Sequence, residues 1–480
     1  MPKAALLWFR QDLRLADNPA LAAAVAAGGA VIPLYILDEQ GMGNWPLGGA
    51  SRWWLHGSLA TLTLSLARAG VRLVLRRGPA ATVIEDVLKE TGAEAVYWNR
   101  CYEPAAIARD RDIKQQLRAR GVTAESFNSA LLFEPWSIKT GQGTPFKVFT
   151  PFWGALRRQP TPAAPMPPPP RLRAPESMPP SDVLDGWGLL PRRPDWAGGL
   201  RDSWVPGESG ARQRLADFID SALRDYPAGR DRPGQVGTSR LSPHLHWGEI
   251  SPRQVWHAVA AAASHISDAA VESYLRELGW REFTHHLLFH WPTLPEEPWR
   301  PEFARFPWQP DAKLLAAWQR GQTGYPMVDA GMRELWHTGW MHNRVRMIAA
   351  SFLVKDLLIP WQEGEAWFWD TLVDADLAQN AASWQWVAGS GADAAPFFRI
   401  FNPVGQGERF DPRGDFVRRW VPELARLPDD VLHKPWLAPA ETLQAADVAL
   451  GRDYPAPIIA HGEARQRALA AFQSLKATAE

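Results

Sequence analysis

The sequence contains one cysteine, Cys101, in 480 residues. A single thiol can form neither an intrachain disulfide nor a cysteine-ligated metal cluster. The sequence also lacks an uninterrupted apolar run of about 18 residues, the length that a membrane-spanning helix requires. Its start leads directly into the strand-like segment AALLWF at residues 4–9, so we expect no signal peptide. These absences predict a soluble, cytoplasmic protein that does not associate with a membrane.

Net charge is also absent, because 52 basic side chains balance 52 acidic ones. Attraction of the whole molecule to a polyanion is therefore not predicted, and such binding would need a local basic face. Tyrosine is scarce, with 7 residues, whereas tryptophan is abundant, with 26. Most tryptophans pack in cores and interfaces, so only those that fall within a recognisable motif are candidates for a functional role.

Three familiar site signatures are missing or incomplete. The glycine fingerprint of Rossmann-type dinucleotide binding does not occur. The segment GQGTPFK at 141–147 lacks the Gly-Lys-Ser/Thr ending of a phosphate-binding loop, and we interpret it, with the VFTPFW that follows, as a lead into a linker. His286 and His290 have the i, i+4 spacing of a helical metal site, but no HExxH pattern or cysteine accompanies them. We expect no metal site, and interpret these histidines and the HLH at 244–246 as packing or hydrogen-bonding residues.

Residues 4 to about 130 alternate between strand-like and helix-like segments. The strand-like runs are AALLWF, AVIPLYIL, VRLVLRRG and EAVYWN. Buried strands that alternate with helices predict a doubly wound parallel α/β sheet. Ligands of such sheets bind beyond the carboxyl ends of the strands, which places the expected ligand edge near Asp38 and residues 99–103.

A proline-rich stretch follows at residues 159–206, including PMPPPP and MPPSD, and such a composition cannot sustain helices or central strands. Beyond residue 208 the patterns are helical, with N-cap signals such as SPRQ at 251, and predict an all-helical domain large enough for its own cofactor cavity. We therefore predict an α/β domain at 1–135, a linker at 136–207 and an all-helical domain at 208–480.

Three long, irregular segments carry the strongest functional signal. They are GTSRLSPHLHWGEISPRQ at 237–254, WMHNRVRM at 340–347 and DADLAQNAASWQWVAGSGADAAPFFRIFNP at 374–403. The first alone indicates either a helix N-cap with a surface arginine or an anion site of hydroxyls, N–H groups and positive charge. The small residues of the third would let a large flat group come close. Together the three resemble the photolyase/cryptochrome family of light-driven flavoproteins.

The resemblance covers nearly the whole chain, is weakest in the linker, and points within the family to bacterial class I and class III cyclobutane pyrimidine dimer photolyases. It implies an N-terminal antenna-binding domain and an all-α C-terminal domain that binds FAD. The single cysteine excludes the iron–sulfur branch of the family. By resemblance, the FAD-binding residues are Tyr226, Thr238, Ser239, Arg240, Leu241, Ser242, Glu277, Arg281, Asn343, Arg346, Asp374, Ala375, Asp376 and Asn380.

Two of these assignments have a physical rationale. Arg346 is the expected partner of Asp374, because unpaired carboxylates in a closed pocket are costly. The alternative for Asp374 and Asp376 is a helix N-cap pair. Asn380 matches the residue that faces the central-ring nitrogen of the flavin, where an amide can donate or accept a hydrogen bond. Photolyases of this type carry asparagine there and plant cryptochromes carry aspartate.

Three tryptophans match the electron-transfer chain of the family. The resemblance orders them from Trp384, nearest the flavin, through Trp361 to Trp308, nearest the solvent. The alternative is that all three are ordinary core residues.

UV-damaged DNA is the implied partner, with the damaged dinucleotide flipped out of the duplex. Trp280 and Trp386 match the aromatic walls around it, and Met347 matches a residue against the pyrimidine pair. Glu277 matches the acid that hydrogen-bonds the thymine edge and supplies or holds a proton. The remaining substrate contacts implied by resemblance are Asn343, Arg230, Arg344, Arg399 and Gln406. For the arginines, a solvated surface role is the alternative.

The N-terminal segments WFRQDLRLADNPAL and YWNRCYEPAAIARD resemble the antenna-binding domain of the family. Glu103 matches the acid that contacts a folate pterin, and the alternative is a surface glutamate that starts a helix. The segment PLGGASRWWLHGSL is more similar to class III enzymes and plant cryptochromes, which favours methenyltetrahydrofolate over a deazaflavin.

We therefore predict a deoxyribodipyrimidine photolyase, in which light-excited reduced FAD transfers an electron to a cyclobutane pyrimidine dimer. The pair Asn343 and Met347 favours this lesion over the (6-4) photoproduct, since enzymes for the latter carry a second histidine and lack the methionine. A cryptochrome-like photoreceptor or a (6-4) lyase is the alternative, and the lack of a long polar tail counts against the receptor. A thermal flavoenzyme would need a nicotinamide site, which we do not find. We expect a monomer without an obligate protein partner.

Overall fold

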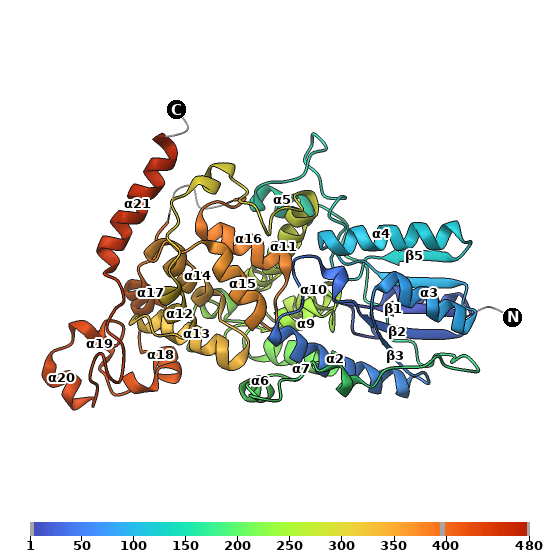
Figure 1. The fold of residues 1–480 in the computed structure, drawn as a ribbon, viewed down its shortest axis with the longest axis horizontal. Helices are drawn as coiled ribbons and strands as arrows, with labels where there is room; N and C mark the ends of the chain where they lie inside the picture. The colour runs from blue at the N-terminus through green and yellow to red at the C-terminus, as the bar shows by residue number, and fades with distance from the viewer. Residues whose placement is uncertain (1–3, 394–398, 478–480) are drawn as a thin grey trace. The chain divides into compact units, whose positions relative to one another are not determined.

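The computed structural model describes residues 4–393 and 399–477 (Figure 1). The chain divides into two compact units, each assembled from separate stretches of sequence. Unit 1 comprises residues 1–221, 239–292 and 373–376, and unit 2 comprises residues 222–238, 293–372 and 377–480. Unit 1 thus contains, together with the sheet, parts of the predicted all-helical domain, namely residues 239–292 and 373–376. The sequence boundaries at 135 and 207 stay predictions.

Unit 1 contains a five-stranded sheet with the order β3-β2-β1-β4-β5. Its strands, all parallel, are β1 (Ala5–Phe9), β2 (Val31–Leu37), β3 (Val74–Arg77), β4 (Ala95–Asn99) and β5 (Thr123–Phe127). The connecting helices are α1 (Pro19–Ala26), α2 (Gly49–Arg68), α3 (Ala80–Thr91) and α4 (Pro104–Ala119), with a short turn η1 (Gln40–Met42). The chain moves outward from β1 to β3 and then crosses to β4, which confirms the predicted doubly wound sheet.

Hydrophobic burial explains why these runs form strands. Every residue of β1 and β2 is buried, as expected for strands covered on both faces. Leu6, Ile32 and Val96 from three neighbouring strands pack in one core with Ile84 of α3 and Ile113 of α4. The carboxyl ends of β1 and β4 lie side by side at the centre of the sheet, the place where doubly wound sheets bind ligands.

The rest of unit 1 is helical or irregular among its described residues. Its elements are α5 (Phe149–Arg157), η2 (Leu184–Trp187), α6 (Gly198–Ser203), α7 (Glu208–Ser221), α9 (Ser242–His246), α10 (Pro252–Ala261), η3 (Ala262–Ser264) and α11 (Asp268–His290). Short helices occur within residues 159–206, where the proline-rich composition predicted none; they lie in the part of the stretch that follows its densest prolines. The predicted N-cap at Ser251 is a full capping box, in which Ser251 and Gln254 exchange side-chain to backbone hydrogen bonds.

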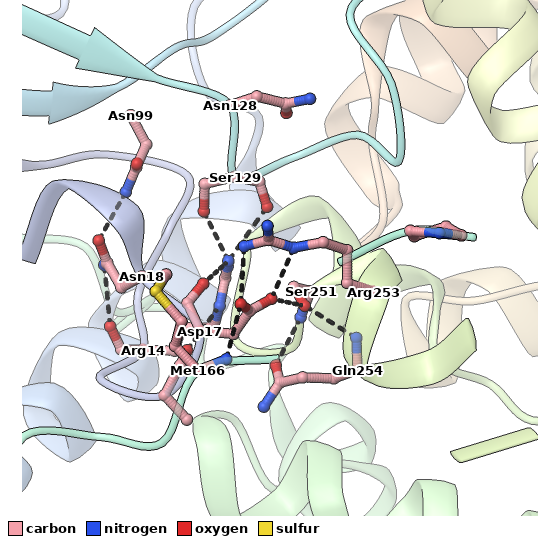
Figure 2. Close-up of polar contacts among 12 residues, drawn as sticks. Arg14, Asp17, Asn18, Asn99, Asn128, Ser129, Met166, Ser251, Arg253 and Gln254 are labelled. Atoms are coloured by element: carbon pink, nitrogen blue, oxygen red, sulfur yellow. Dashed lines mark hydrogen bonds and ion pairs between the residues drawn. The ribbon is translucent and has the colours of Figure 1, made fainter. Parts of the chain in front are cut away.

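A buried polar network joins the loop after β1 to α10 (Figure 2). The Arg14 guanidinium donates to the backbone oxygens of Asp17 and Ser129. The Asp17 carboxylate accepts from the Ser251 hydroxyl and from the Arg253 guanidinium at 2.6 Å. These contacts fix α10, and with it the segment leading to α11, against the sheet region of unit 1.

The described residues of unit 2 form helices joined by irregular segments, with an isolated β-bridge between Leu450 and Tyr454. Its elements are α8 (Tyr226–Gly229), η4 (Pro301–Arg305), α12 (Ala312–Gln319), α13 (Pro326–Thr338), α14 (Asn343–Ser351), η5 (Phe352–Asp356), α15 (Trp361–Thr371), α16 (Leu377–Ala388), α17 (Pro403–Phe410), α18 (Asp415–Trp420), η6 (Pro422–Leu424), α19 (Asp429–Leu432), η7 (Pro435–Leu437), α20 (Ala440–Ala445) and α21 (His461–Ala477). No helix among the described residues combines the length and apolar character needed to cross a membrane.

Candidate functional site

The predicted site residues are distributed over both units. Those in unit 1 are Glu103, Ser239, Arg240, Leu241, Ser242, Glu277, Trp280, Arg281, Asp374, Ala375 and Asp376. Those in unit 2 are Tyr226, Arg230, Thr238, Trp308, Asn343, Arg344, Arg346, Met347, Trp361, Asn380, Trp384, Trp386, Arg399 and Gln406. Residues 394–398 of the third motif lie outside the described residues.

The GTSRLS segment is an irregular turn that ends where α9 begins, at Ser242. Arg240 has φ +49°, a left-handed conformation that is uncommon for residues other than glycine. The Ser239 hydroxyl accepts a hydrogen bond of 2.9 Å from the Tyr274 hydroxyl of α11. Burial raises the pKa of Tyr274, so the phenol stays a donor. The turn therefore has a fixed shape, with Leu241 buried and Ser242 exposed.

Helix α11 presents Glu277 and Trp280 from neighbouring positions on its surface, and both are half-buried. The Trp280 indole stacks face to face on Phe149 of α5, with ring centroids 3.6 Å apart and planes inclined by 7°. Phe283 meets the Trp280 ring edge-on at 6.0 Å. The orientation of Trp280 is thus set by aromatic neighbours from two helices.

Asp374 and Asp376 are both buried, and the Asp376 N–H donates to the backbone oxygen of Asp374 at 2.7 Å. Two histidines approach the Asp376 carboxylate, His285 Nε2 at 3.4 Å and His246 Nδ1 at 4.0 Å. Burial lowers the pKa of His246 to about 4 and also lowers the pKa of His285, so both rings are neutral at pH 7. Asp376 directly precedes α16, so the N-cap alternative stays open.

Arg281 and Glu282 hold α11 to the segment after β5. The Arg281 guanidinium donates to the backbone oxygen of Ala130 at 2.6 Å. The Glu282 carboxylate accepts from the backbone N–H groups of Leu132 and Phe133, and burial raises its pKa to about 7.

Glu103 begins α4 but does not cap it with its side chain. Its carboxylate instead accepts from Gln11 Nε2 at 3.1 Å. Its pKa is raised, chiefly by burial and further by the negative charge of Asp376. The side chain is half-buried. The helix-start alternative thus accounts for the backbone of Glu103 but not for the direction of its carboxylate.

In unit 2, Asn380 of α16 is buried and donates to the backbone oxygen of Glu365 of α15 at 3.0 Å. The Glu365 side chain is fully buried, and neither of its carboxyl oxygens has a hydrogen-bond partner among the described residues. Burial raises the pKa of Glu365 well above its ordinary value and so favours the protonated, neutral form of the acid.

The three candidate electron-transfer tryptophans differ in exposure. Trp384 and Trp361 are buried, whereas Trp308 is half-buried and packs on Phe306 at 4.4 Å. A side chain at Gly364 would place its Cβ 2.1 Å from the Trp384 ring, so glycine is required for the close approach of α15 to this indole. Trp308 is the most exposed of the three, as expected for the tryptophan nearest the solvent, whereas Trp384 and Trp361 are not separated by exposure. The electron-transfer role of all three stays a prediction.

Arg344 of α14, one of the predicted rim arginines, is held by an acidic and an aromatic neighbour. Its Nη2 bonds the Asp231 carboxylate at 2.8 Å, and its guanidinium lies 4.4 Å from the centre of the Phe410 ring. Met347 lies beside it, with Sδ 4.0 Å from Arg344 Nη1. Unit 2 thus brings Arg344 and Met347 together.

The remaining predicted residues of unit 2 have varied surroundings. Arg230 lies over the Tyr226 ring at 5.4 Å. The Arg346 Nε donates to the Met341 backbone oxygen at 2.8 Å, and its predicted pairing with Asp374 stays a prediction. Thr238, Trp386 and Gln406 are half-buried, and Asn343 and Arg399 are exposed.

Among the described residues, no group of three or more histidine, cysteine, aspartate or glutamate side chains is arranged to hold a metal ion. His286 instead makes two hydrogen bonds: its Nδ1 lies 2.9 Å from the Pro135 oxygen, and its Nε2 accepts from the Phe146 N–H at 3.0 Å. These bonds fix the neutral tautomer with the proton on Nδ1.

The sequence analysis did not name four residues that the structure places in contact with predicted site residues. They are Phe149, Glu365, His246 and His285. The i, i+4 spacing of Arg281 and His285 could have indicated the latter, because it places both on one face of α11. Nothing local distinguishes Phe149 or Glu365, whose surroundings arise from helix packing.

Comparison with known proteins identifies the family. Residues 5–171 match the family model described as DNA photolyase, and residues 274–474 match the FAD binding domain of DNA photolyase. The chain is 55% identical to a protein named deoxyribodipyrimidine photo-lyase from Agrobacterium fabrum, over 98% of each chain. It is 42% identical to cryptochrome-1 of Arabidopsis thaliana, over 96% of this chain and 69% of that protein.

Solved structures agree with this relationship. The crystal structure of a class III photolyase from Agrobacterium tumefaciens superposes with a TM-score of 0.97 at 55% identity, covering 99% of this chain and 98% of that one. A Synechocystis cryptochrome superposes with a TM-score of 0.88 at 30% identity, covering 98% and 99%. The chain therefore belongs to the DNA photolyase/cryptochrome family.

Proposed function

We propose that this protein is a deoxyribodipyrimidine photolyase that uses blue light and bound FAD to repair cyclobutane pyrimidine dimers in DNA. The observation that carries this proposal is the identity of 55%, over 98% of each chain, with a protein of that name. The match of residues 274–474 to the FAD binding domain of DNA photolyase supports FAD as the cofactor. Bound reduced FAD would supply, under light, the electron that opens the dimer, and the electron would return to it, so that no net redox change results.

The residues of unit 1 fit such a cofactor. The left-handed turn at Arg240 brings a guanidinium, two serine hydroxyls and backbone N–H groups into one short segment, a donor set suited to a pyrophosphate. Asp374 and Asp376 are buried, and the neutral His246 and His285 approach the Asp376 carboxylate at 4.0 Å and 3.4 Å. We propose that these residues, with Leu241 and Ala375, bind FAD and that Arg281 orients it.

In unit 2, Asn380 fits the role of the residue that faces the flavin. One amide N–H is committed to the Glu365 carbonyl, which fixes the side chain and leaves its oxygen and second N–H for a ligand. We propose that Tyr226, Thr238, Asn343 and Arg346 also bind FAD. Trp384, Trp361 and Trp308 would carry electrons that keep it reduced.

We propose that Trp280 and Trp386 stack on the flipped-out bases, that Met347 contacts the dimer, and that Glu277 hydrogen-bonds the thymine edge and holds a proton there. Phosphate contacts and the lesion rim would come from Arg230, Arg344, Arg399, Gln406 and Asn343. The half-buried state of Trp280 supports the first assignment, because a stacking wall must expose one face.

For the antenna, we propose methenyltetrahydrofolate, contacted by Glu103, with a deazaflavin as the alternative. The support is the Glu103 carboxylate, which accepts from Gln11 Nε2 and makes no capping bond to α4. Retention of folate by the purified wild type and its loss from Glu103→Ala would support this assignment, whereas a deazaflavin extracted from the protein would contradict it. We also propose that the protein acts as a cytoplasmic monomer.

The decisive experiment is photoreduction of the protein followed by illumination with an oligonucleotide that carries a thymine cyclobutane dimer. Thymine absorbance should return in the light and not in the dark. Glu277→Gln should abolish most of this recovery, whereas Glu272→Gln on the same helix, which keeps the acceptor for Trp153 Nε1, should not. Normal photoreduction without recovery of thymine would contradict the proposal and favour a photoreceptor or a (6-4) enzyme.

A further inference from the structure

The Trp280 indole stacks closely on the Phe149 ring, with 3.6 Å between ring centroids. Its two rings differ in exposure. Phe149 is 1% exposed, whereas Trp280 is half-buried. One face of the indole is therefore occupied by the phenyl ring, and solvent reaches another part of the same residue.

Phe149 is held by residues from one stripe of α11. Arg276, Trp280 and Phe283 follow one another at helical spacing of four and three residues. The Arg276 guanidinium lies 5.0 Å from the Phe149 ring centre, and Phe283 meets that ring edge-on at 5.9 Å. The phenyl ring thus has a single position against the helix that carries Trp280.

The helices approach so closely that glycine is required at the crossing. A Cβ on Gly279 would lie 2.4 Å from the Trp153 ring of α5. Trp153 is parallel to Phe149, with planes inclined by 12°, and its Nε1 donates to Glu272 of α11 at 3.1 Å. The arrangement of α5 on α11 is therefore fixed independently of any ligand.

We propose that Phe149 is a positioning residue for lesion recognition: it backs Trp280 and fixes the plane of the indole before the damaged dinucleotide arrives. The inference rests on the proposed function, in which Trp280 stacks on a flipped-out base. A wall that is already ordered loses less side-chain entropy on binding than a mobile one. An indole without Phe149 behind it would have to be ordered by the substrate itself.

The test compares Phe149→Leu with Phe152→Leu. Phe152 is a buried phenylalanine on the same helix that contacts Phe146, Phe283 and His286. Affinity is measured in the dark for a duplex with one thymine dimer and for the same undamaged duplex. Phe149→Leu should weaken binding of the dimer duplex roughly three- to tenfold, the range expected from one aromatic pair, with unchanged affinity for undamaged DNA. Phe152→Leu should leave the preference for the dimer intact.

Two further measurements distinguish positioning from general destabilisation. In Phe149→Leu the repair rate at saturating dimer should stay near that of the wild type, while KM for the dimer should rise. In a Trp280→Ala background, Phe149→Leu should have no additional effect on dimer affinity.

The outcomes separate the inference from the function on which it rests. An equal loss of dimer affinity in both leucine variants, or a loss in Phe149→Leu that adds fully to that of Trp280→Ala, would overturn the role of Phe149 alone. A wild-type protein that binds damaged and undamaged duplexes equally would overturn the proposed function, and this inference with it.

Discussion

The side-chain amide of Asn380 donates a hydrogen bond of 3.0 Å to the backbone carbonyl oxygen of Glu365. This contact fixes which end of the amide is the nitrogen, because two oxygens would repel each other at that distance. It also links α16 to α15 at a buried position. The orientation of the Asn380 amide is therefore set by the fold.

Asn380→Asp should destabilise the protein in a pH-dependent way. A carboxylate has no hydrogen to offer the Glu365 oxygen, so the folded state should raise the pKa of the new acid and favour its protonated form. Stability should be nearly preserved at low pH and reduced at pH 8 by about 1–3 kcal/mol, the cost of an unsatisfied buried acceptor. Urea unfolding at both pH values measures this. Asn402→Asp is the control, because that exposed helix cap uses only its oxygen; equal losses at both pH values in Asn380→Asp would contradict the argument.

Glu365→Gln should stabilise the protein at alkaline pH. The buried acid has a pKa well above its ordinary value of 4.5, so the folded state holds a proton that the unfolded chain releases. Its contribution is fully present below about pH 4.5 and is lost as the pH rises toward the raised value. The wild type should therefore be less stable than the variant at pH 8, and the gap should shrink toward pH 4. Thermal unfolding measures this gap. The control Glu363→Gln, at an exposed position of the same helix, should not change the pH dependence of stability.

Gly364→Ala should displace Trp384. The new methyl group would begin 2.1 Å from the indole, and neither the helix nor the buried ring has room to yield freely. Overpacking of this kind costs roughly 1–3 kcal/mol. We expect lower stability, measured by urea unfolding, and slower photoreduction of the flavin, measured by its absorbance under blue light. Gly462→Ala in α21, where the added Cβ meets nothing within 4 Å, should leave both unchanged; comparable behaviour of the two variants would refute the steric explanation.

The sheet could be predicted from the sequence largely because burial on both faces leaves continuous apolar runs. AALLWF, AVIPLYIL, VRLVLRRG and EAVYWN correspond to β1, β2, β3 and β4. The fifth strand, Thr123–Phe127, has one fully buried residue, Ala124, so its sequence TAESF carries no such run. An edge strand is specified by its partner more than by its own composition.

The candidate site divides in the same way. Residues within long motifs, such as Asp374, Asn380 and Trp384, could be proposed because those motifs resemble a known family. Phe149 could not, because VFTPFW contains no feature that indicates a stack on a tryptophan of a distant helix. Glu365 was equally hidden, since a glutamate on an amphipathic helix is normally solvated and its burial depends on the helices around it.

His286 should make the protein sensitive to acid. Its Nε2 must stay unprotonated to accept from the Phe146 N–H, and burial lowers its pKa from 6.5 to about 4. The unfolded chain binds this proton near pH 6.5 and the folded protein does not, so stability present above pH 6.5 is lost as the pH falls toward 4. At 1.36 kcal/mol per pKa unit, the loss of stability from this residue would reach roughly 3 kcal/mol.

His286→Gln tests this, because glutamine supplies both an amide donor for Pro135 and an oxygen acceptor for Phe146. The stability of the variant, measured by urea unfolding, should depend less steeply on pH between 4 and 7. The exposed His265→Gln should reproduce the slope of the wild type, and an unchanged slope in His286→Gln would mean that other buried groups, such as His246, account for the acid sensitivity.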